Sequence, residues 1–211
     1  MPLLSFEESH ALVKKYKIPT PRYATAKNPE ELRRVLRKYK FPVVMKLVSP
    51  NVVHKSDVGG VILNIRSEEE ALRTFEKFWK ICRKKKFKFS GALVQEQVDG
   101  QYVLVGLKND PQFGPVVAFG LGGIFVEIMK DVSFRVCPLS DRDVDEMIHE
   151  IKGYPILAGA RGERPVDIRA VKQVIKAVSS MGMKENVKEM DINPLVVSPK
   201  GAWAVDVRVI K

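Results

Sequence analysis

Apolar positions recur along this chain with two different periods, which predicts that helices and strands are interleaved. Apolar residues spaced three or four apart follow helix-start signals, such as Ser5 with Glu8 and Asn28 before Pro29. Alternating or continuous apolar runs between turn residues predict strands. Helices are expected over 5–16, 28–40, 141–152 and 167–181, with another opening at 67–70, and strands over 23–24, 41–48, 61–65, 92–98, 102–107, 115–119, 124–128, 189–197 and 202–210.

Turn residues indicate how some of these strands are joined. Asp99-Gly100 predicts a hairpin between 92–98 and 102–107, and 198–201 predicts a second hairpin between the last two strands. The run Gly120-Leu121-Gly122-Gly123 fits either a turn or a loop that another group approaches closely. The whole pattern indicates an α+β or α/β protein with a seam near residues 90–96.

Composition narrows the class of protein. The chain has 211 residues, of which 45% are apolar, so it can bury a sizeable core and is neither a disordered tail nor a disulfide-stapled miniprotein. No stretch reaches the roughly 20 apolar residues that a membrane span requires, and the first residues lack a signal-peptide pattern. The two cysteines, Cys82 and Cys137, match no zinc spacing. We therefore expect a soluble, cytoplasmic protein.

The charge is strongly basic, with 36 Lys and Arg against 25 Asp and Glu, a net charge of +11. The densest cations lie between Lys80 and Lys88 at the end of a predicted helix. Such a stripe occurs in nucleic-acid-binding proteins, but also at solvated helix C-termini, where the helix dipole favours cations. No zinc-finger signature or aromatic platform accompanies it. The solvated face is favoured, and a basic nucleic-acid-binding module stays open as the alternative.

The last predicted hairpin places polar groups across from each other. Its first strand alternates so that Asp191 and Asn193 share one face, and a turn centred on Pro199-Lys200 sets Asn193 directly opposite Asp206. Opposed residues have Cβ atoms about 4.5–5.5 Å apart. An amide oxygen and a carboxylate at that separation can share Mg²⁺. The alternative is an ordinary solvent-exposed polar face.

Two further features suggest contact with phosphate. Lys46 lies late in an apolar strand, so its ammonium group is expected either at a bound anion or at an exposed strand edge. In the polar loop that follows, Gly59 and Gly60 let backbone N–H groups approach phosphate oxygens closely. His54 in the same loop could carry a phosphoryl group as a nucleophile, or could simply be solvated.

Taken together, these segments resemble the ATP-grasp subunit of ADP-forming acyl-CoA synthetases, the acetate–CoA ligase (ADP-forming) β subunit. The resemblance covers nearly the whole chain, in order. The matching stretches are 44–50, His54-Lys55-Ser56-Asp57-Val58-Gly59-Gly60-Val61, 109–117, 119–123, 130–135 and Asp191-Ile192-Asn193-Pro194-Leu195.

The resemblance implies a reaction and a role for several residues. Acyl-CoA, ADP and phosphate would give the free acid, CoA and ATP, and His54 would relay a phosphoryl group from a phosphohistidine on the partner α subunit to ADP. Lys46 matches the lysine that binds nucleotide phosphates. Asn193 and Asp206 match the Mg²⁺ ligands of the related succinyl-CoA synthetase β subunit. The segment Gln95, Glu96 and Val98 matches the strand and hinge that hold adenine.

The resemblance also implies an ATP-grasp fold of two α+β subdomains, residues 1–95 and 96–211, with ADP or ATP between them. An α subunit with the CoA-binding and ligase domains is the expected partner, and the chain is expected to end where a free-standing β subunit ends. One position departs from the family pattern, since Tyr102 stands where a Glu is expected. An ATP-grasp carboxylate–amine ligase is the alternative enzyme, although no residues for its acceptor site are evident.

Overall fold

The computed structural model describes residues 3–52, 55–122 and 131–211, which form two compact units. The small unit comprises Pro21–Gln97, and the large unit comprises Met1–Thr20 together with Val98–Lys211. Each unit has its own hydrophobic core and its own antiparallel sheet, as an α+β fold requires. None of the described helices combines the length and the apolar character that crossing a membrane demands.

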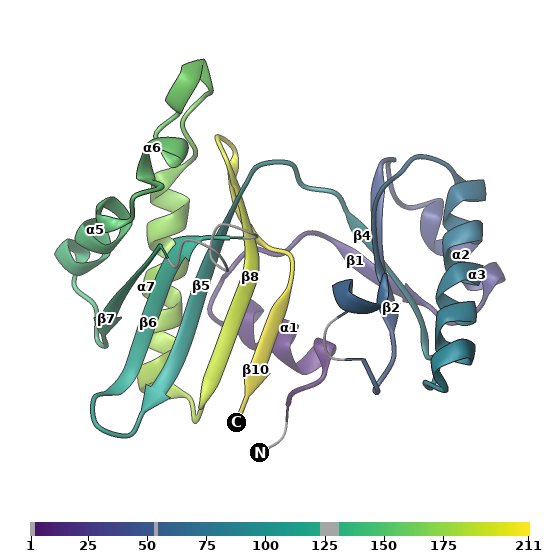
Figure 1. The fold of residues 1–211 in the computed structure, drawn as a ribbon, viewed down its shortest axis with the longest axis horizontal. Coiled ribbons are helices and arrows are strands. Elements are labelled where there is room, and N and C mark those ends of the chain that lie inside the picture. Colours follow the sequence, from purple (N-terminus) through teal and green to yellow (C-terminus); the bar gives the residue numbers. More distant parts are fainter. Residues whose placement is uncertain (1–2, 53–54, 123–130) are drawn as a thin grey trace. The chain divides into compact units, whose positions relative to one another are not determined.

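The small unit packs two helices on one face of a four-stranded sheet (Figure 1). The strands follow the order β1-β4-β2-β3, and the buried side chains of Leu32, Met45 and Phe78 lie in the core between sheet and helices. Its elements are β1 (Tyr23–Ala26), α2 (Pro29–Leu36), β2 (Val43–Val48), the 3-10 turn η1 (Ser56–Val58), β3 (Val61–Ile65), α3 (Glu68–Lys85) and β4 (Gly91–Glu96).

The large unit is built on a six-stranded sheet with helices α1, α5 and α7 packed into one continuous core (Figure 1). The strand order is β10-β8-β5-β6-β7, and β9 pairs with the C-terminal part of β8. Its elements are α1 (Phe6–Lys15), β5 (Gln101–Asp110), β6 (Gly114–Leu121), β7 (Val132–Val136), α5 (Asp141–Glu150), α6 (Tyr154–Leu157), η2 (Ala160–Gly162), α7 (Ile168–Lys184), β8 (Glu189–Ser198), β9 (Gly201–Ala204) and β10 (Val207–Ile210).

The helix-start signals act as the sequence predicts. The Ser5 hydroxyl accepts the Glu8 N–H while the Glu8 carboxylate accepts the Ser5 N–H, which completes a capping box for α1. Asn28 caps α2 ahead of Pro29. Because these caps satisfy backbone N–H groups that no helical carbonyl can reach, they define where each helix begins.

The hairpin predicted around Asp99-Gly100 is wrong. Strand β4 pairs with β1 and β2 in the small unit, whereas β5 pairs with β6 and β8 in the large unit. Asp99-Gly100 therefore follows the crossing between the units instead of turning one strand back on its neighbour. A Cβ at Gly100 would lie 2.2 Å from the Val197 carbonyl oxygen, so a close approach to β8 requires this glycine.

The boundary predicted for the first subdomain also differs from the observed units. The segment Met1–Thr20 belongs with the C-terminal part of the chain. The Leu4 N–H donates to the Val209 carbonyl at 2.9 Å, and the Ala204 N–H donates to the Pro19 carbonyl at 2.8 Å. The apolar face of α1 completes the core of the large unit, which sequence periodicity cannot reveal.

Other boundaries shift by smaller amounts. Strand β6 continues through Gly120 and Leu121, where the sequence suggested a turn, and the short elements β7 and α6 were not predicted. The predicted strand 202–210 is split into β9 and β10. The strand predicted over 124–128 lies outside the described residues.

The assignment of α1 to the large unit can be tested with a pair of core truncations. Val13 is fully buried in the core of the large unit, and Leu32 is fully buried in that of the small unit. Val13→Ala is expected to cost about 2 kcal/mol and to speed amide hydrogen exchange in β8 and β10. Leu32→Ala should instead speed exchange in β1 and β4. Faster exchange in β1 and β4 on Val13→Ala would contradict the assignment.

Candidate functional site

Lys46 lies inside the sheet of the small unit, on the face away from the helices. It pairs with Leu93 on β4 and Val61 on β3, while its neighbours Met45 and Leu47 point into the core. The Lys46 side chain is only 6% exposed. A buried ammonium group requires an anion or strong acceptors. Lys46 therefore does not lie at an exposed strand edge, since β2 runs between β4 and β3, and its contact with a bound anion stays a prediction.

Gly59 and Gly60 lead from the turn η1 into β3, where Gly60 directly precedes Val61, the partner of Lys46. Gly59 ends the turn η1 with φ +68°, a conformation that favours glycine. A Cβ on Gly60 would lie 2.9 Å from the Lys55 carbonyl oxygen and 3.0 Å from the Leu47 Cβ. Both glycines thus have backbone reasons for their identity, and they bring main-chain groups close to Lys46. His54, the predicted phosphoryl carrier, lies outside the described residues.

The predicted adenine segment leads from the small unit into the large one. Gln95 is 1% exposed and lies opposite Val44, on the same face of the sheet as Lys46. Glu96 is the last residue of β4, and its N–H donates to the Arg22 carbonyl at 2.9 Å. Val98 is the first residue of the large unit after the crossing.

The predicted pairing of Asn193 with Asp206 is confirmed. The Asn193 N–H donates to the Asp206 carbonyl at 3.2 Å, and the pairs on either side, Leu195 with Ala204 and Ile192 with Val207, keep the predicted register. Their role as metal ligands stays a prediction.

Both strands are irregular at this pair. Ile192 and Leu195 are both fully buried although three positions apart, and they face Val105 and Val103 on β5, which are two apart. Strand β8 therefore has a bulge at Asn193-Pro194. The return strand is interrupted at Val205-Asp206, between buried Ala204 and Val207. The bulge leaves Asn193 exposed and Asp206 partly exposed.

This part of the candidate site also contains Asp191 and Arg208, for which the sequence predicted no role. They are directly paired across β8 and β10, one pair below Ile192 and Val207. Burial raises the pKa of Asp191 to about 6, with nearby Asp206 and Glu189 adding to the rise and Arg208 opposing it. The buried Nε of Arg208 has no hydrogen-bond partner among the described residues. Strand alternation already placed Asp191 on the face of Asn193, but its partial burial could not be predicted.

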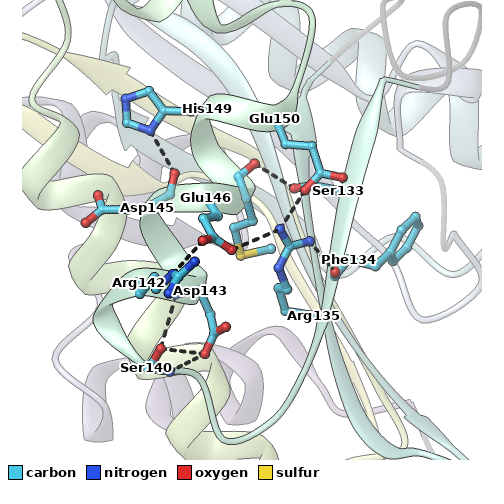
Figure 2. Close-up of polar contacts among 11 residues, drawn as sticks. Ser133, Phe134, Arg135, Ser140, Arg142, Asp143, Asp145, Glu146, His149 and Glu150 are labelled. Atoms are coloured by element: carbon cyan, nitrogen blue, oxygen red, sulfur yellow. Dashed lines mark hydrogen bonds and ion pairs between the residues drawn. The ribbon is translucent and has the colours of Figure 1, made fainter.

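The stretch 131–135, another motif of the resemblance, lies mostly in β7, and its side chains contact helix α5 (Figure 2). The Ser133 hydroxyl donates to the Met147 carbonyl at 2.7 Å, and the Arg135 guanidinium lies 2.7 Å from the Glu150 carboxylate. The Asp131 carboxylate accepts the N–H groups of Lys152 and Gly153 beyond the helix. These contacts hold α5 on the edge of the sheet. His149 on α5 contacts the Asp145 carbonyl at 2.7 Å.

The side-chain oxygens of Asn193 and Asp206 suit a hard cation such as Mg²⁺ that takes its other ligands from a bound nucleotide and water. Within the described residues, no three His, Cys, Asp or Glu side chains are grouped as a metal site. Asn193 and Asp206 alone would supply two oxygens, and Mg²⁺ commonly takes one or two protein carboxylates together with phosphates and water. The residues present therefore fit Mg²⁺ bound together with a nucleotide.

Comparison with known proteins identifies the family of the chain. The model of the ATP-grasp domain family matches residues 2–210. The β subunit of acetate–CoA ligase (ADP-forming) I from Pyrococcus furiosus is 47% identical over 207 residues, covering 96% of this chain and 89% of that subunit. Acetate–CoA ligase (ADP-forming) I from Archaeoglobus fulgidus is 43% identical, and the match covers 96% of this chain but only 30% of that longer protein.

A solved structure of the dinucleotide-forming acetyl-coenzyme A synthetase 1 from Candidatus Korarchaeum cryptofilum is also similar. The identity is 42% and the TM-score is 0.85, with 99% of this chain and 92% of that chain covered. That protein was solved with coenzyme A and Mg-AMPPCP, with its phosphohistidine segment pointing towards the nucleotide-binding site. The chain therefore belongs to the ATP-grasp family, among the β subunits of ADP-forming acetate–CoA ligases.

Proposed function

We propose that this chain binds ADP and Mg²⁺ and makes ATP with a phosphoryl group relayed through His54. In the forward direction, a phosphohistidine on the partner subunit transfers its phosphoryl group to the imidazole of His54. The P–N bond on His54 then breaks as an oxygen of the ADP β-phosphate forms the new P–O bond. Coupled to the partner's chemistry, acyl-CoA, ADP and phosphate give the free acid, CoA and ATP.

The pairing of Asn193 with Asp206 is the observation that carries this proposal. The main chains of an exposed Asn193 and a partly exposed Asp206 are paired at a bulge, beside Asp191 with its raised pKa. A cation bound there would neutralise charge on the nucleotide phosphates, which is the main electrostatic requirement of phosphoryl transfer. Asn193 and Asp206 would hold it, and Asp191 would add negative charge next to it.

Lys46 and the two glycines support the phosphate side of the proposal. A buried Lys46 ammonium can contact phosphate oxygens without competition from bulk water. The N–H groups of Gly59 and Gly60 already donate to the Ser56 and Lys55 carbonyls, so these glycines support the proposal only through the close approach that their missing side chains allow. The role of Tyr102 is unassigned; its side chain is 45% exposed on β5.

The partner is proposed to be an α subunit with CoA-binding and ligase domains. Relatives in which the matching region is 30% of a longer chain support this, because the remainder of such a chain can supply those domains. We also propose a cytoplasmic location. The two cysteines are free and buried, which suits a reducing compartment.

Removing the proposed metal ligand should weaken nucleotide binding only when Mg²⁺ is present. Asp206→Ala is expected to raise the Kd for ADP at least about tenfold in Mg²⁺, because a charge-assisted contact to the cation is lost. In EDTA the variant and the unmodified chain should bind ADP alike. Titration calorimetry measures both. Asp141→Ala, which removes an exposed carboxylate on α5, is the matched control. An equal loss in EDTA would contradict the metal role.

The relay predicts that binding and chemistry can be separated at His54. His54→Ala should lower ATP formation by the assembled enzyme at least about 1,000-fold, since the nucleophile of one step is missing. Its Kd for ADP should stay within about twofold. Transfer of labelled phosphate onto this chain, assayed as acid-labile label, should vanish. His149→Ala is the control and should retain activity. Full ATP formation by His54→Ala would rule the relay out.

The raised pKa of Asp191 makes stability depend on pH. The folded state binds this proton more tightly than the unfolded chain does, so the carboxyl destabilises the fold increasingly as pH rises from about 4 to about 6. Asp191→Asn should therefore match the unmodified chain near pH 4 and exceed its unfolding free energy by about 2–3 kcal/mol at pH 7. Urea unfolding in EDTA tests this. A gain of equal size at pH 4 would show that the carboxyl charge is not the cause.

A further inference from the structure

The edge strand β3 of the small unit contains a bulge at Leu63 and Asn64. Val43 on β2 pairs with Ile65, but Met45 pairs with Ile62, so Leu63 and Asn64 together face Val44. Asn64 has φ +57°, in the left-handed region. Among residues other than glycine, asparagine and aspartate adopt this conformation most readily. The bulge therefore suits Asn64 and turns it out of the regular ladder.

Asn64 forms a two-point contact with Gln97. The Asn64 main-chain N–H donates to Gln97 Oε1 at 2.8 Å, and Gln97 Nε2 donates to Asn64 Oδ1 at 2.7 Å. The two residues are 33 positions apart, and β2 lies between their strands. Both ends of the Gln97 amide are thus held by one residue. Gln97 cannot rotate freely while this contact persists.

Gln97 is the last residue of the small unit, directly between Glu96 and Val98. The preceding residue, Glu96, is held by the segment just before β1, because its N–H donates to the Arg22 carbonyl. The Arg22 guanidinium stacks 4.6 Å from the centre of the Tyr39 ring and donates to the Lys38 carbonyl. Two independent anchors therefore fix the chain just where it leaves the sheet.

We propose that Asn64 and Gln97 are positioning residues for the base of the bound nucleotide. This inference rests on the proposed nucleotide binding and on the match of the segment Gln95, Glu96 and Val98 to the strand and hinge that hold adenine in the family. The Asn64–Gln97 contact holds the Gln97 side chain back against β3 and so fixes the main chain of that segment before the nucleotide arrives. Preorganisation of this kind raises affinity because less conformational freedom is lost on binding. Neither residue needs to touch the nucleotide.

The variants can separate the contact from backbone strain. Asn64→Gly removes the Oδ1 acceptor, and glycine adopts φ +57° without strain. Asn64→Asp keeps an acceptor for Gln97 Nε2 and tolerates the same conformation. Gln97→Met has a similar length and removes both hydrogen bonds.

The full chain is titrated with ADP and, separately, with inorganic pyrophosphate, both in Mg²⁺. Asn64→Gly and Gln97→Met are expected to raise the Kd for ADP about five- to tenfold, in line with the loss of hydrogen bonds in an exposed pair. The Kd for pyrophosphate should not change, because pyrophosphate has no base. Asn64→Asp should restore ADP binding to within about twofold, and the double variant should bind no worse than either single one.

Results other than these expected ones overturn the inference. An unchanged Kd for ADP excludes the positioning role, and an equal loss for ADP and pyrophosphate indicates general damage to the fold. Lys46→Met, which should weaken both ligands, reports on the proposed function itself. If Lys46→Met weakens both while Asn64→Gly changes neither, the positioning role alone fails. If the unmodified chain binds no ADP, the proposed function and this inference fail together.

Discussion

Strand β8 must bury both Ile192 and Leu195, and an ordinary strand cannot do so. Side chains alternate between the two faces, so residues three positions apart normally point in opposite directions. The extra residue at Asn193-Pro194 resolves this conflict, and the interruption at Val205-Asp206 repeats the solution on the return strand. The polar pair Asn193 and Asp206 is thereby directed out of the core. The hydrophobic packing of the large unit and the geometry of its candidate metal site have the same cause.

The sequence alone predicted the features that depend on residues close together in the chain, and it failed where residues far apart in the chain make contact. The register of Asn193 and Asp206 was predictable because one short turn and two alternating strands determine it. The hairpin at Asp99-Gly100 failed because turn chemistry is local and does not specify the sheet in which each flanking strand pairs. The placement of the segment around α1 in the large unit depends on hydrogen bonds of Leu4 and Pro19 with β10 and β9, nearly 200 residues away, which leave no local signal. Asp191 was visible as a polar position, but its burial depends on the packed sheet.

The positive charge of the protein is divided very unequally. The small unit carries 18 Lys and Arg against 8 Asp and Glu, a net charge of +10, whereas the large unit carries 18 against 17. The cationic stripe after Lys80 belongs to this positively charged unit, so its charge by itself does not indicate nucleic-acid binding. A unit that contains Lys46 and a large positive field attracts small polyanions, and nucleotides are the polyanions that an ATP-grasp protein binds. The large unit, which supplies the proposed cation site, is close to neutral overall.

Residues near the two ends of the chain meet at one edge of the large unit, where Leu3 bridges to Ile210 and Leu4 bonds to Val209. In topological terms the small unit is an insertion between α1 and β5. A domain joined covalently before Leu3 or after Ile210 would therefore emerge beside β10. Evolution could thus exchange a separate partner for a fused one, in either order along the gene, without rebuilding the sheet that carries Asn193 and Asp206.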